Sequence, residues 1–559
     1  MKRPELFSIA PALSRREILA DALAGGSLVV LTLPLAVAFA MASGMTPASG
    51  LAGAVLGCLI VSAFGGGRFQ IAGPSATFAV VLYSIGLRYG FPGIQLVSIM
   101  AGSLLIVTGL LGLGGLVHFI PYTMVTGYTA GAAVLIALTG VSDILGIERY
   151  FLPDHLAGKI GFFINSISSF DPASALVGLG TLVCIILWSK LLPRFPGSLP
   201  AIALATLAAA AFGVPVATIG LRYGDFSRIF TPSLPPLPDY QLLHDLIPKA
   251  LPFALLIAVE SLLSGAVADG MTGRKHNANT DLAALGLANI VIPLFGGIPV
   301  SISVERTTAN IRSGASSPVS GVMNALFLFL ITLCCAPLVS LIPIPALAAV
   351  LVHLAFRMID PVSIRSVFRG QKSDAAVMTA TFAVTVFLSL TTALGVGFLL
   401  SAFFFIKKMI DLASFSAIKT ELSEADRDPE ESDPNSVASR SIPPDAAVFE
   451  ISGPLFFGSV QKFSQTLRSS MHGCRAMILR MRNTVYLDDA GIRMLVQLGE
   501  DCKKRGILLL ISDIHTQPYM LACKSGLEEK LSPGAILGNL DEALAYAARS
   551  MVSPVSDEE

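Results

Sequence analysis

Glu260 is the residue of this sequence with the clearest capacity for chemistry, because it stands inside a long apolar run. Leu255 to Val259 precede it, Leu262 and Leu263 follow it, and Ser264 lies one helical turn further on the same face. An acidic group within an apolar segment of this length is costly and marks a functional site by default. Because low-dielectric surroundings favour the neutral form of a carboxyl group, Glu260 is a candidate proton carrier. The alternative is a structurally paired carboxylate at a helix end.

A second group of polar residues follows a pair of glycines. The stretch 296–310 opens with two glycines and a proline, continues with an extended pattern and ends in a short helical pattern that begins near Ser303. Ser303 suits the cap of that helix, and Glu305 is a favourable charge for its first turn. The positive end of such a helix favours an anion. Glu305 and Arg306 either form a neutral pair that stabilises the helix, or Arg306 offsets charge at the site while Glu305 carries a proton.

The stretch 65–78, in the first half of the chain, has the same order of residue types. Three glycines lead to a short extended pattern, then to Gly73-Pro74, a hydroxyl residue and a helical tail. Pro74 suits a first helical turn, where an N–H group would have no partner. Non-helical backbone persists at membrane depth only where protein buries it or water lines it. Two interrupted segments in corresponding places predict an inverted repeat with one site between its halves, and two kinks in packed helices are the alternative.

The candidate site residues lie at these two predicted helix starts. The backbone N–H groups there are expected to matter more than the serine side chains, and Phe78 would supply an aromatic wall. The candidates for substrate binding are Ala76, Thr77, Phe78, Ser301, Ile302, Ser303 and Arg306, and those for proton coupling are Glu260 and Glu305.

The composition assigns most of the chain to a membrane. Of its 559 residues 53% are hydrophobic and only 14% are charged, with a mean hydropathy of +0.72, whereas soluble domains carry roughly a quarter of charged residues. The 38 basic and 38 acidic residues cancel, so a nucleic-acid partner is not expected. Seven cysteines without metal-type spacing predict reduced thiols and no metal site. No Cys/His cluster, Ser-His-Asp pattern or phosphate-binding loop supports an enzyme or a cofactor.

Hydropathy and helix breakers predict an α-helical polytopic membrane protein of about fourteen segments, two of them half-helices. Seven segments in each half imply that the second repeat inserts with inverted topology. The segments are roughly 22–42, 50–64, 74–88, 92–112, 116–142, 173–191, 198–212, 248–269, 281–295, 303–312, 317–341, 345–359, 373–392 and 394–410. The predicted domains are an N-terminal segment 1–20, a transmembrane domain 21–412 with repeats at about 21–215 and 248–412, an acidic linker 413–443, a soluble domain 444–550 and a tail 551–559.

The basic residues predict N- and C-termini on the cytoplasmic side of a plasma (inner) membrane. With the N-terminus inside, the cytoplasmic connections hold Arg68, Arg274, Arg357 and Arg365 among others. The bias is incomplete, because several basic residues, such as Arg88, fall on the outer side.

The C-terminal domain shows a different pattern, in which strands alternate with helices. Strands are expected at 448–451, 476–480 and 507–511, and helices near 460–470, 489–504, 516–525 and 541–549. This alternation is typical of a small α/β layer. The topology places the domain in the cytoplasm.

Several motifs together make the chain resemble the sulfate permease (SulP) family of anion transporters, and the C-terminal domain resembles a STAS domain. The resemblance covers nearly the whole chain. Its carriers are Pro34, Met45-Thr46-Pro47, Gly73 to Phe78, Glu260 to Leu263, Asp269 to Gly273, Leu285 to Ile290 and Ala309 to Pro318. Within the family, the stretch 269–289 is most similar to bacterial C4-dicarboxylate transporters of the DauA type. The resemblance implies a fourteen-span inverted repeat, a mobile core domain, a gate domain and a homodimer.

Three departures from the family pattern affect the interpretation. STAS relatives of the anti-sigma-antagonist type have Asp-Ser-Ser-Gly where this chain has the sequence 488–491, Asp-Asp-Ala-Gly, so a phospho-switch there is not expected. Asp281 stands where many members have glutamate, which is a neutral change. Glu305 stands where the family has a small residue, and it shares its register with a substrate-contacting glutamate of related nucleobase-cation symporters. This last departure raises a weak-acid or neutral substrate as a rival to a simple anion.

The leading hypothesis is a secondary active transporter that takes up C4-dicarboxylates such as succinate or fumarate together with protons by alternating access. Members with aspartate at the position of Glu260 can use sodium, and the longer glutamate favours protons. The alternatives are a sulfate or bicarbonate symporter or exchanger, a proton-coupled nucleobase-like transporter, a channel, and a membrane-anchored STAS sensor or scaffold. The expected partners are the anion, protons, the lipid bilayer, a second copy of the chain and a cytoplasmic protein that binds the STAS domain.

Overall fold

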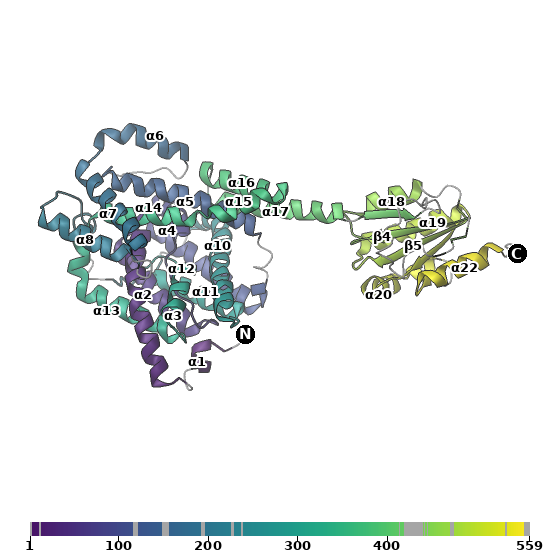
Figure 1. Ribbon diagram of the computed structural model, residues 1–559, viewed down its shortest axis with the longest axis horizontal. Helices are drawn as coiled ribbons and strands as arrows, with labels where there is room; N and C mark the ends of the chain where they lie inside the picture. Colours follow the sequence, from purple (N-terminus) through teal and green to yellow (C-terminus); the bar gives the residue numbers. More distant parts are fainter. Residues whose placement is uncertain are drawn as a thin grey trace. The chain divides into compact units, whose positions relative to one another are not determined.

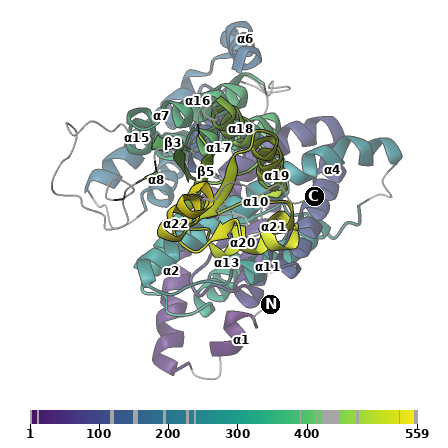
Figure 2. The same ribbon diagram turned by 90° about the vertical axis from the view of Figure 1, so that its right-hand side faces the viewer.

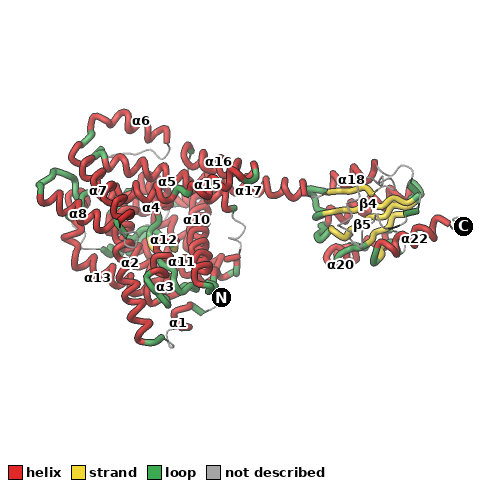
Figure 3. The backbone as a smooth tube through the Cα atoms, viewed as in Figure 1, coloured by secondary structure: helices red, strands yellow, loops and turns green. Residues whose placement is uncertain are grey.

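The computed structural model in Figure 1 describes residues 3–9, 13–115, 121–147, 156–191, 196–224, 229–235, 239–388, 390–412, 414–418, 440, 442–443, 445–469, 474–531 and 534–552. They form two compact units, Met1–Ser401 and Ala402–Glu559. The first unit is built almost entirely of helices, drawn in red in Figure 3, and the second contains a β-sheet, drawn in yellow.

The helical unit consists of apolar helices that agree with the predicted segments. By length and composition, nine helices of the described chain suffice to cross a membrane, and α8 and α11 are shorter apolar helices. The main helices are α2 (Arg15–Ala42), α3 (Pro47–Phe64), α4 (Ala76–Leu110), α5 (Tyr122–Ile144), α7 (Pro172–Leu191), α8 (Ser198–Ala211), α10 (Tyr240–Thr272), α11 (Ala278–Leu294), α12 (Val304–Arg312), α13 (Val319–Ser340), α14 (Ile344–Met358), α16 (Lys372–Phe387) and α17 (Leu390–Leu412). The predicted helical membrane fold is confirmed, and residues 116–120 of one predicted segment lie outside the described residues.

The structure differs from the prediction in how some helices join and in four short helices. The third and fourth predicted segments continue into each other as α4, which is interrupted at Gly90, where φ is 65°. A residue with a side chain rarely adopts this left-handed backbone, so glycine permits the kink. The additional helices are α1 (Glu5–Ile9), α6 (Leu156–Ser166), α9 (Ile219–Tyr223) and α15 (Pro361–Arg369). Helix α6 lies at one extremity of the helical unit and α1 at the opposite one (Figures 1 and 2).

The helices pack as two groups. In the first group α4 packs against α10 and α11, α3 against α2, α11 and α13, and α2 against α13, while α12 packs against α10 and α2. In the second group α5 packs against α14 and α16, and α7 against α8 and α14. The groups meet where α4 contacts α5 and where α2 contacts α8 and α14. We refer to these sets as the first and the second helix group.

Small residues allow the close packing of the first helix group. A Cβ atom added to Gly102 of α4 would lie 2.7 Å from the carbonyl oxygen of Gly286 in α11, and one added to Gly286 would lie 2.5 Å from the carbonyl oxygen of Gly102. Membrane helices approach each other this closely only where side chains are absent or small. The glycine pair therefore fixes α11 directly against α4, the helix that carries one of the interrupted segments.

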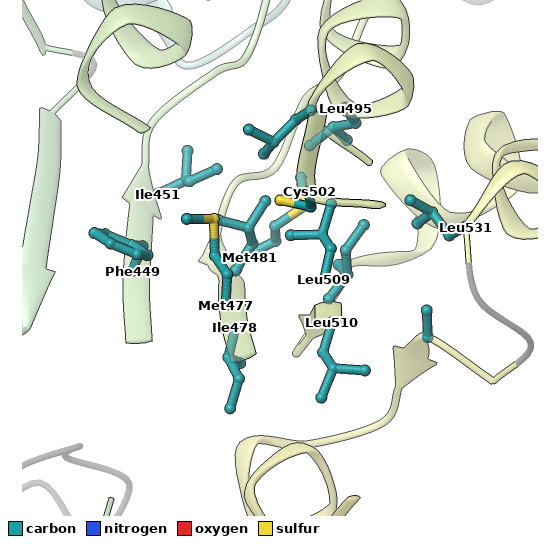
Figure 4. Packing of buried hydrophobic residues seen from close by; sticks show 14 of the residues in the cluster. Phe449, Ile451, Met477, Ile478, Met481, Leu495, Cys502, Leu509, Leu510 and Leu531 are labelled. Atoms are coloured by element: carbon teal, nitrogen blue, oxygen red, sulfur yellow. The ribbon is translucent and has the colours of Figure 1, made fainter. Parts of the chain in front are cut away.

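The C-terminal unit is a five-stranded sheet with the order β3-β4-β5-β6-β7. Strand β3 (Ser414–Ile418) is antiparallel to β4 (Ala446–Ser452), and β5 (Ala476–Asn483), β6 (Leu508–Ser512) and β7 (Ile536–Leu537) follow in parallel. Helices α18 (Val460–Ser469), α19 (Asp489–Lys504), α20 (Thr516–Lys524), α21 (Leu527–Lys530) and α22 (Leu540–Val552) complete the unit. Phe449, Ile478, Leu495 and Leu510 are among the residues of its apolar core (Figure 4).

Strand β3 differs from the sequence prediction. The acidic linker was expected to start at residue 413, but 414–418 form an edge strand that pairs with 448–452. The strand has only five residues and lies next to the acidic stretch, so its own sequence pattern is weak. The acidic residues 421–433 of the predicted linker lie outside the described residues.

Candidate functional site

The two interrupted segments meet directly. Strand β1 (Ala72–Gly73) pairs antiparallel with β2 (Ser301–Ile302), with Ala72 opposite Ile302 and Gly73 opposite Ser301. Each strand leads at once into a helix, α4 or α12, so the pairing brings two helix N-termini together. Ser75 and Ser303 occupy the N-cap positions, and neither side chain makes a capping hydrogen bond in the part of the chain that is described. The first-turn N–H groups are therefore left for water or a ligand, and an anion is favoured there.

Glu260 of α10 joins the two interrupted segments. Its carboxylate accepts hydrogen bonds from Ser301 Oγ at 2.7 Å, from Ser75 Oγ at 3.2 Å and from Thr77 Oγ1. The neighbouring Ser261 Oγ accepts a hydrogen bond from the backbone N–H of Ile302 at 3.1 Å. Three hydroxyl donors from two separate segments thus converge on one partly buried carboxylate, so its charge is felt by both helix starts.

Arg306 of α12 is the second charged group of the site. The residue is 1% exposed, and its Nη2 donates a hydrogen bond to the carbonyl oxygen of Pro74. Nε and Nη1 have no hydrogen-bond partner among the described residues. Its guanidinium also lies against Gly73, where an added Cβ atom would be 2.1 Å from Nη1. A buried guanidinium without a paired charge is costly, which favours the arrival of an anion.

The neutral pair of Glu305 and Arg306, one of the two alternatives for these residues, is not observed. Within the described chain, no ion pair joins Arg306 to Glu305 or to Glu260. Glu305 is half-buried and faces a cavity instead. Its carboxylate is thus placed where an entering ligand would meet it.

Side chains from the first helix group hold the broken segments in place. Asn289 of α11 binds both backbone groups of Val300, the residue before β2: its Oδ1 accepts from Val300 N at 2.8 Å and its Nδ2 donates to Val300 O at 3.0 Å. Asp281 of α11 accepts from Gly66 N at 2.7 Å, in the loop before β1. Asn310 of α12 donates to the carbonyl oxygen of Phe69 at 2.9 Å. These bonds satisfy backbone groups that a spanning helix would have satisfied internally.

A cavity of about 320 Å³ lies beside the two helix starts. Its polar end consists of Glu260, Arg306 and the helix starts, and its other walls are mainly apolar. Both helix groups contribute: the first supplies Leu35, Phe39, Ser75, Ala76, Thr77, Leu256, Val259, Glu260, Leu263, Ile302, Ser303, Val304, Glu305 and Arg306, and the second supplies Met124, Val125, Tyr128, Thr129, Leu354, Arg357 and Met358, together with Leu394 at the start of α17. The cavity therefore lies between the two groups.

Most of the predicted site residues surround this cavity. Those that line it are Ala76, Thr77, Ile302, Ser303, Arg306, Glu260 and Glu305. Ser301 takes part through its hydrogen bond to Glu260. Phe78 does not line the cavity: it is buried, with its ring 5.1 Å from that of Phe253 of α10 in an edge-to-face contact.

Arg357 and Tyr128 are two large polar residues of the cavity that lie outside the predicted set. The sequence predicts Arg357 only in a cytoplasmic connection and does not mark Tyr128 as a site residue. Tyr128 is a polar residue in an apolar segment, which is a weak signal, because such residues occur often in helices of this kind. Only the tertiary contact between the two helix groups distinguishes it.

In the C-terminal unit, Asp488 has a structural role. Its carboxylate accepts from Gly491 N at 2.9 Å, which caps α19, and from Phe457 N at 3.0 Å. The expectation that this loop carries no phospho-switch stays a prediction.

The fold and the site define a class of protein. A helical membrane unit in which two interrupted helices face a shared cavity is typical of secondary transporters, and helix N-termini at the site favour anionic cargo. Comparison with known proteins agrees: residues 18–381 match the Sulfate permease family and residues 438–543 match the STAS domain. The chain belongs to the sulfate permease family and is an anion transporter with a C-terminal STAS domain.

Individual relatives extend over nearly the whole chain. A putative sulfate transporter, YvdB, of Bacillus subtilis is 33% identical over 93% of this chain and 96% of its own length. The bicarbonate transporter BicA of Picosynechococcus is 27% identical over 97% of each chain. The structure of murine Slc26a9, an anion transporter, aligns with a TM-score of 0.87 at 18% identity, covering 98% of this chain and 94% of that one. The expected likeness to C4-dicarboxylate transporters of the DauA type stays a prediction, since these relatives are named for sulfate and bicarbonate.

Proposed function

We propose that this protein carries a small anion across the membrane together with a proton, and that Glu260 carries the proton. The observation behind this proposal is the convergence of hydroxyl groups from both interrupted segments on the Glu260 carboxylate. An ionised Glu260 places a negative charge beside the helix starts and repels an anion. A protonated Glu260 removes that charge, so that the field of the helix starts and of Arg306 acts on the anion alone. Proton and anion binding then favour each other, as symport requires.

The cavity and the known relatives support different anions. The mainly apolar cavity walls suit the carbon atoms of a C4-dicarboxylate, and Arg357 supplies a cation in addition to Arg306. The names of the relatives support sulfate or bicarbonate instead. We propose a small carboxylate or oxyanion as the substrate class, with C4-dicarboxylates as the first candidate and sulfate and bicarbonate as the second.

We also propose an orientation and an assembly. The basic residues Arg357, in the last turn of α14, and Arg365 and Arg369, in α15, support a cytoplasmic location of this side in a plasma membrane. The N-terminus and the STAS domain are then cytoplasmic. A homodimer and a cytoplasmic protein partner of the STAS domain complete the proposal.

Uptake into proteoliposomes made with the full chain tests the proposed function. Labelled succinate, sulfate and bicarbonate are offered separately, with and without an inward proton gradient, and each is competed with fumarate and uracil. Symport predicts that the carried anion accumulates only when the proton gradient is present. A membrane-anchored sensor or scaffold would show no flux, and a channel would show conductance that does not follow the gradient.

A further inference from the structure

The Tyr128 hydroxyl is a buried polar group with no hydrogen-bond partner among the described residues. Tyr128 is 1% exposed, yet its side chain lines the cavity that contains Glu260 and Arg306. A buried tyrosine hydroxyl is normally hydrogen-bonded, because burial without a partner costs about 1–3 kcal/mol. A buried donor without a partner at the wall of a binding cavity can donate a hydrogen bond to the molecule that occupies the cavity.

Tyr128 belongs to the part of the cavity wall that the second helix group contributes. It lies on α5, in the second helix group, whereas Glu260, Arg306 and the two helix starts lie in the first group. The other lining residues of α5 are Met124, Val125 and Thr129. Of these four α5 residues, only Tyr128 and Thr129 have a hydroxyl group. Thr129 is half-buried, and its hydroxyl already donates to the carbonyl oxygen of Val125 at 3.0 Å, so Tyr128 supplies the fully buried hydroxyl.

We propose that the Tyr128 hydroxyl donates a hydrogen bond to the bound anion from the second helix group, and that it makes Tyr128 a specificity-determining residue for anions with several acceptor atoms. The helix starts and Arg306 hold one end of such an anion, and Tyr128 binds another of its oxygen atoms. A halide is a single atom, so it can bind at the helix starts without a hydrogen bond from Tyr128. The inference rests on the proposed function and adds a residue and a selection rule to it.

The selection rule follows from the chemistry of a phenol. The hydroxyl can donate one hydrogen bond, and donation to a charged oxygen is stronger than donation to a neutral one. Removal of the hydroxyl while the ring is kept, as in Tyr128→Phe, leaves the packing of α5 against its neighbours intact. The affinity for an oxyanion or carboxylate should then fall about tenfold, which corresponds to about 1.4 kcal/mol.

The test uses the full chain in proteoliposomes, with labelled succinate, sulfate and bicarbonate as probes and chloride as an unlabelled competitor. Tyr128→Phe is expected to raise the KM of the carried anion about tenfold with little change in kcat, while the inhibition constant of chloride stays within twofold. The matched control is Tyr122→Phe on the same helix, because Tyr122 is 55% exposed and its hydroxyl bonds to Ser363 Oγ at 2.6 Å. The control should leave both constants unchanged.

Two results would overturn the inference. One is an unchanged KM in Tyr128→Phe, and the other is an equal loss of affinity for chloride, which would indicate a general disturbance of the site. Anion-dependent thermal stabilisation of the purified protein by the same probes gives a measure that does not need transport. If a probe stabilises the wild type but no proton-driven uptake is seen, the proposed symport fails. The inference about Tyr128 is then still decided by comparing the stabilisation of the wild type with that of Tyr128→Phe. If no probe binds the wild type, both fail.

Discussion

Glu260→Gln is the most direct perturbation of the proposed coupling, and the structure indicates what it should cost. The carboxylate accepts from Ser75 and Thr77 at Oε1 and from Ser301 at Oε2. A glutamine keeps the size of the side chain but has one acceptor oxygen, and its amide nitrogen only donates. The hydroxyl that faces the amide can rotate and accept instead, so we expect a loss of about 1 kcal/mol. Since the free energy of unfolding of a folded domain is about 5–15 kcal/mol, the variant should fold.

The functional effect should be much larger, because glutamine cannot bind the coupled proton. A proton gradient of one pH unit corresponds to about 1.4 kcal/mol per proton, so the wild type can concentrate a singly coupled substrate about tenfold. Glu260→Gln should reach no accumulation under this gradient, although exchange of labelled for unlabelled anion can persist. The assay compares proton-driven uptake with anion exchange in the same vesicles.

A variant of the same helix provides the control for Glu260→Gln. Ser264 lies one turn from Glu260, and its buried hydroxyl has no hydrogen-bond partner within the described chain. Ser264→Ala should therefore accumulate substrate like the wild type. Undiminished proton-driven accumulation in Glu260→Gln would refute the assignment of the proton to this residue.

Three further predictions concern other parts of the molecule. Gly73→Ala should lower uptake at least tenfold, because the new methyl group would lie 2.1 Å from Nη1 of the buried Arg306, and overpacking of this kind costs about 1–3 kcal/mol and displaces the site. Glu305→Ala should tighten the apparent affinity for the anion in sealed vesicles at a fixed pH, because it removes a carboxylate that faces the cavity at a helix start. Burial raises the pKa of the Cys502 thiol to about 12, so about one thiol in 10⁴ is ionised at pH 8 and maleimide labelling should be very slow until the C-terminal unit unfolds.

Each of these predictions has a control within the chain. Gly270→Ala should be neutral, because a Cβ atom there would meet nothing within 4 Å. An unchanged affinity in Glu305→Ala would show that the Glu305 carboxylate does not act on the bound anion. Cys523 is exposed and should react readily in the folded protein. Labelling of Cys502 at a similar rate would contradict its burial.

The sequence predicted the membrane helices well because their signals are local. Apolar runs and breakers such as Gly296 and Pro299 act within a few residues, and the start of α12 one residue after Ser303 follows from them. The pairing of β1 with β2 could be expected only as a consequence of the repeat, since each strand is two residues long. Such short strands have no periodic pattern of their own.

The sequence predicts the candidate site residues that lie on the interrupted segments, but it does not predict those whose position depends on tertiary packing. Thr77 and Phe78 are adjacent in sequence, but successive helix residues point about 100° apart, so the sequence alone does not say which of them faces the cavity. Thr77 faces it, while Phe78 packs against Phe253. Tyr128 could not be found, because its place at the cavity depends on how α5 approaches the first helix group.

The bonds that hold the interrupted segments indicate which part of the protein moves during transport. Glu260, Asn289 and Asn310 tie β1, β2 and both helix starts together, and all of these groups belong to the first helix group. Breaking such buried bonds one by one would expose unsatisfied polar groups at membrane depth, each at a cost of several kcal/mol. The first group should therefore move as one body with its anion. The wall formed by Tyr128 and Arg357 belongs to the second group, so any contact that the anion makes there must break as the two groups shift.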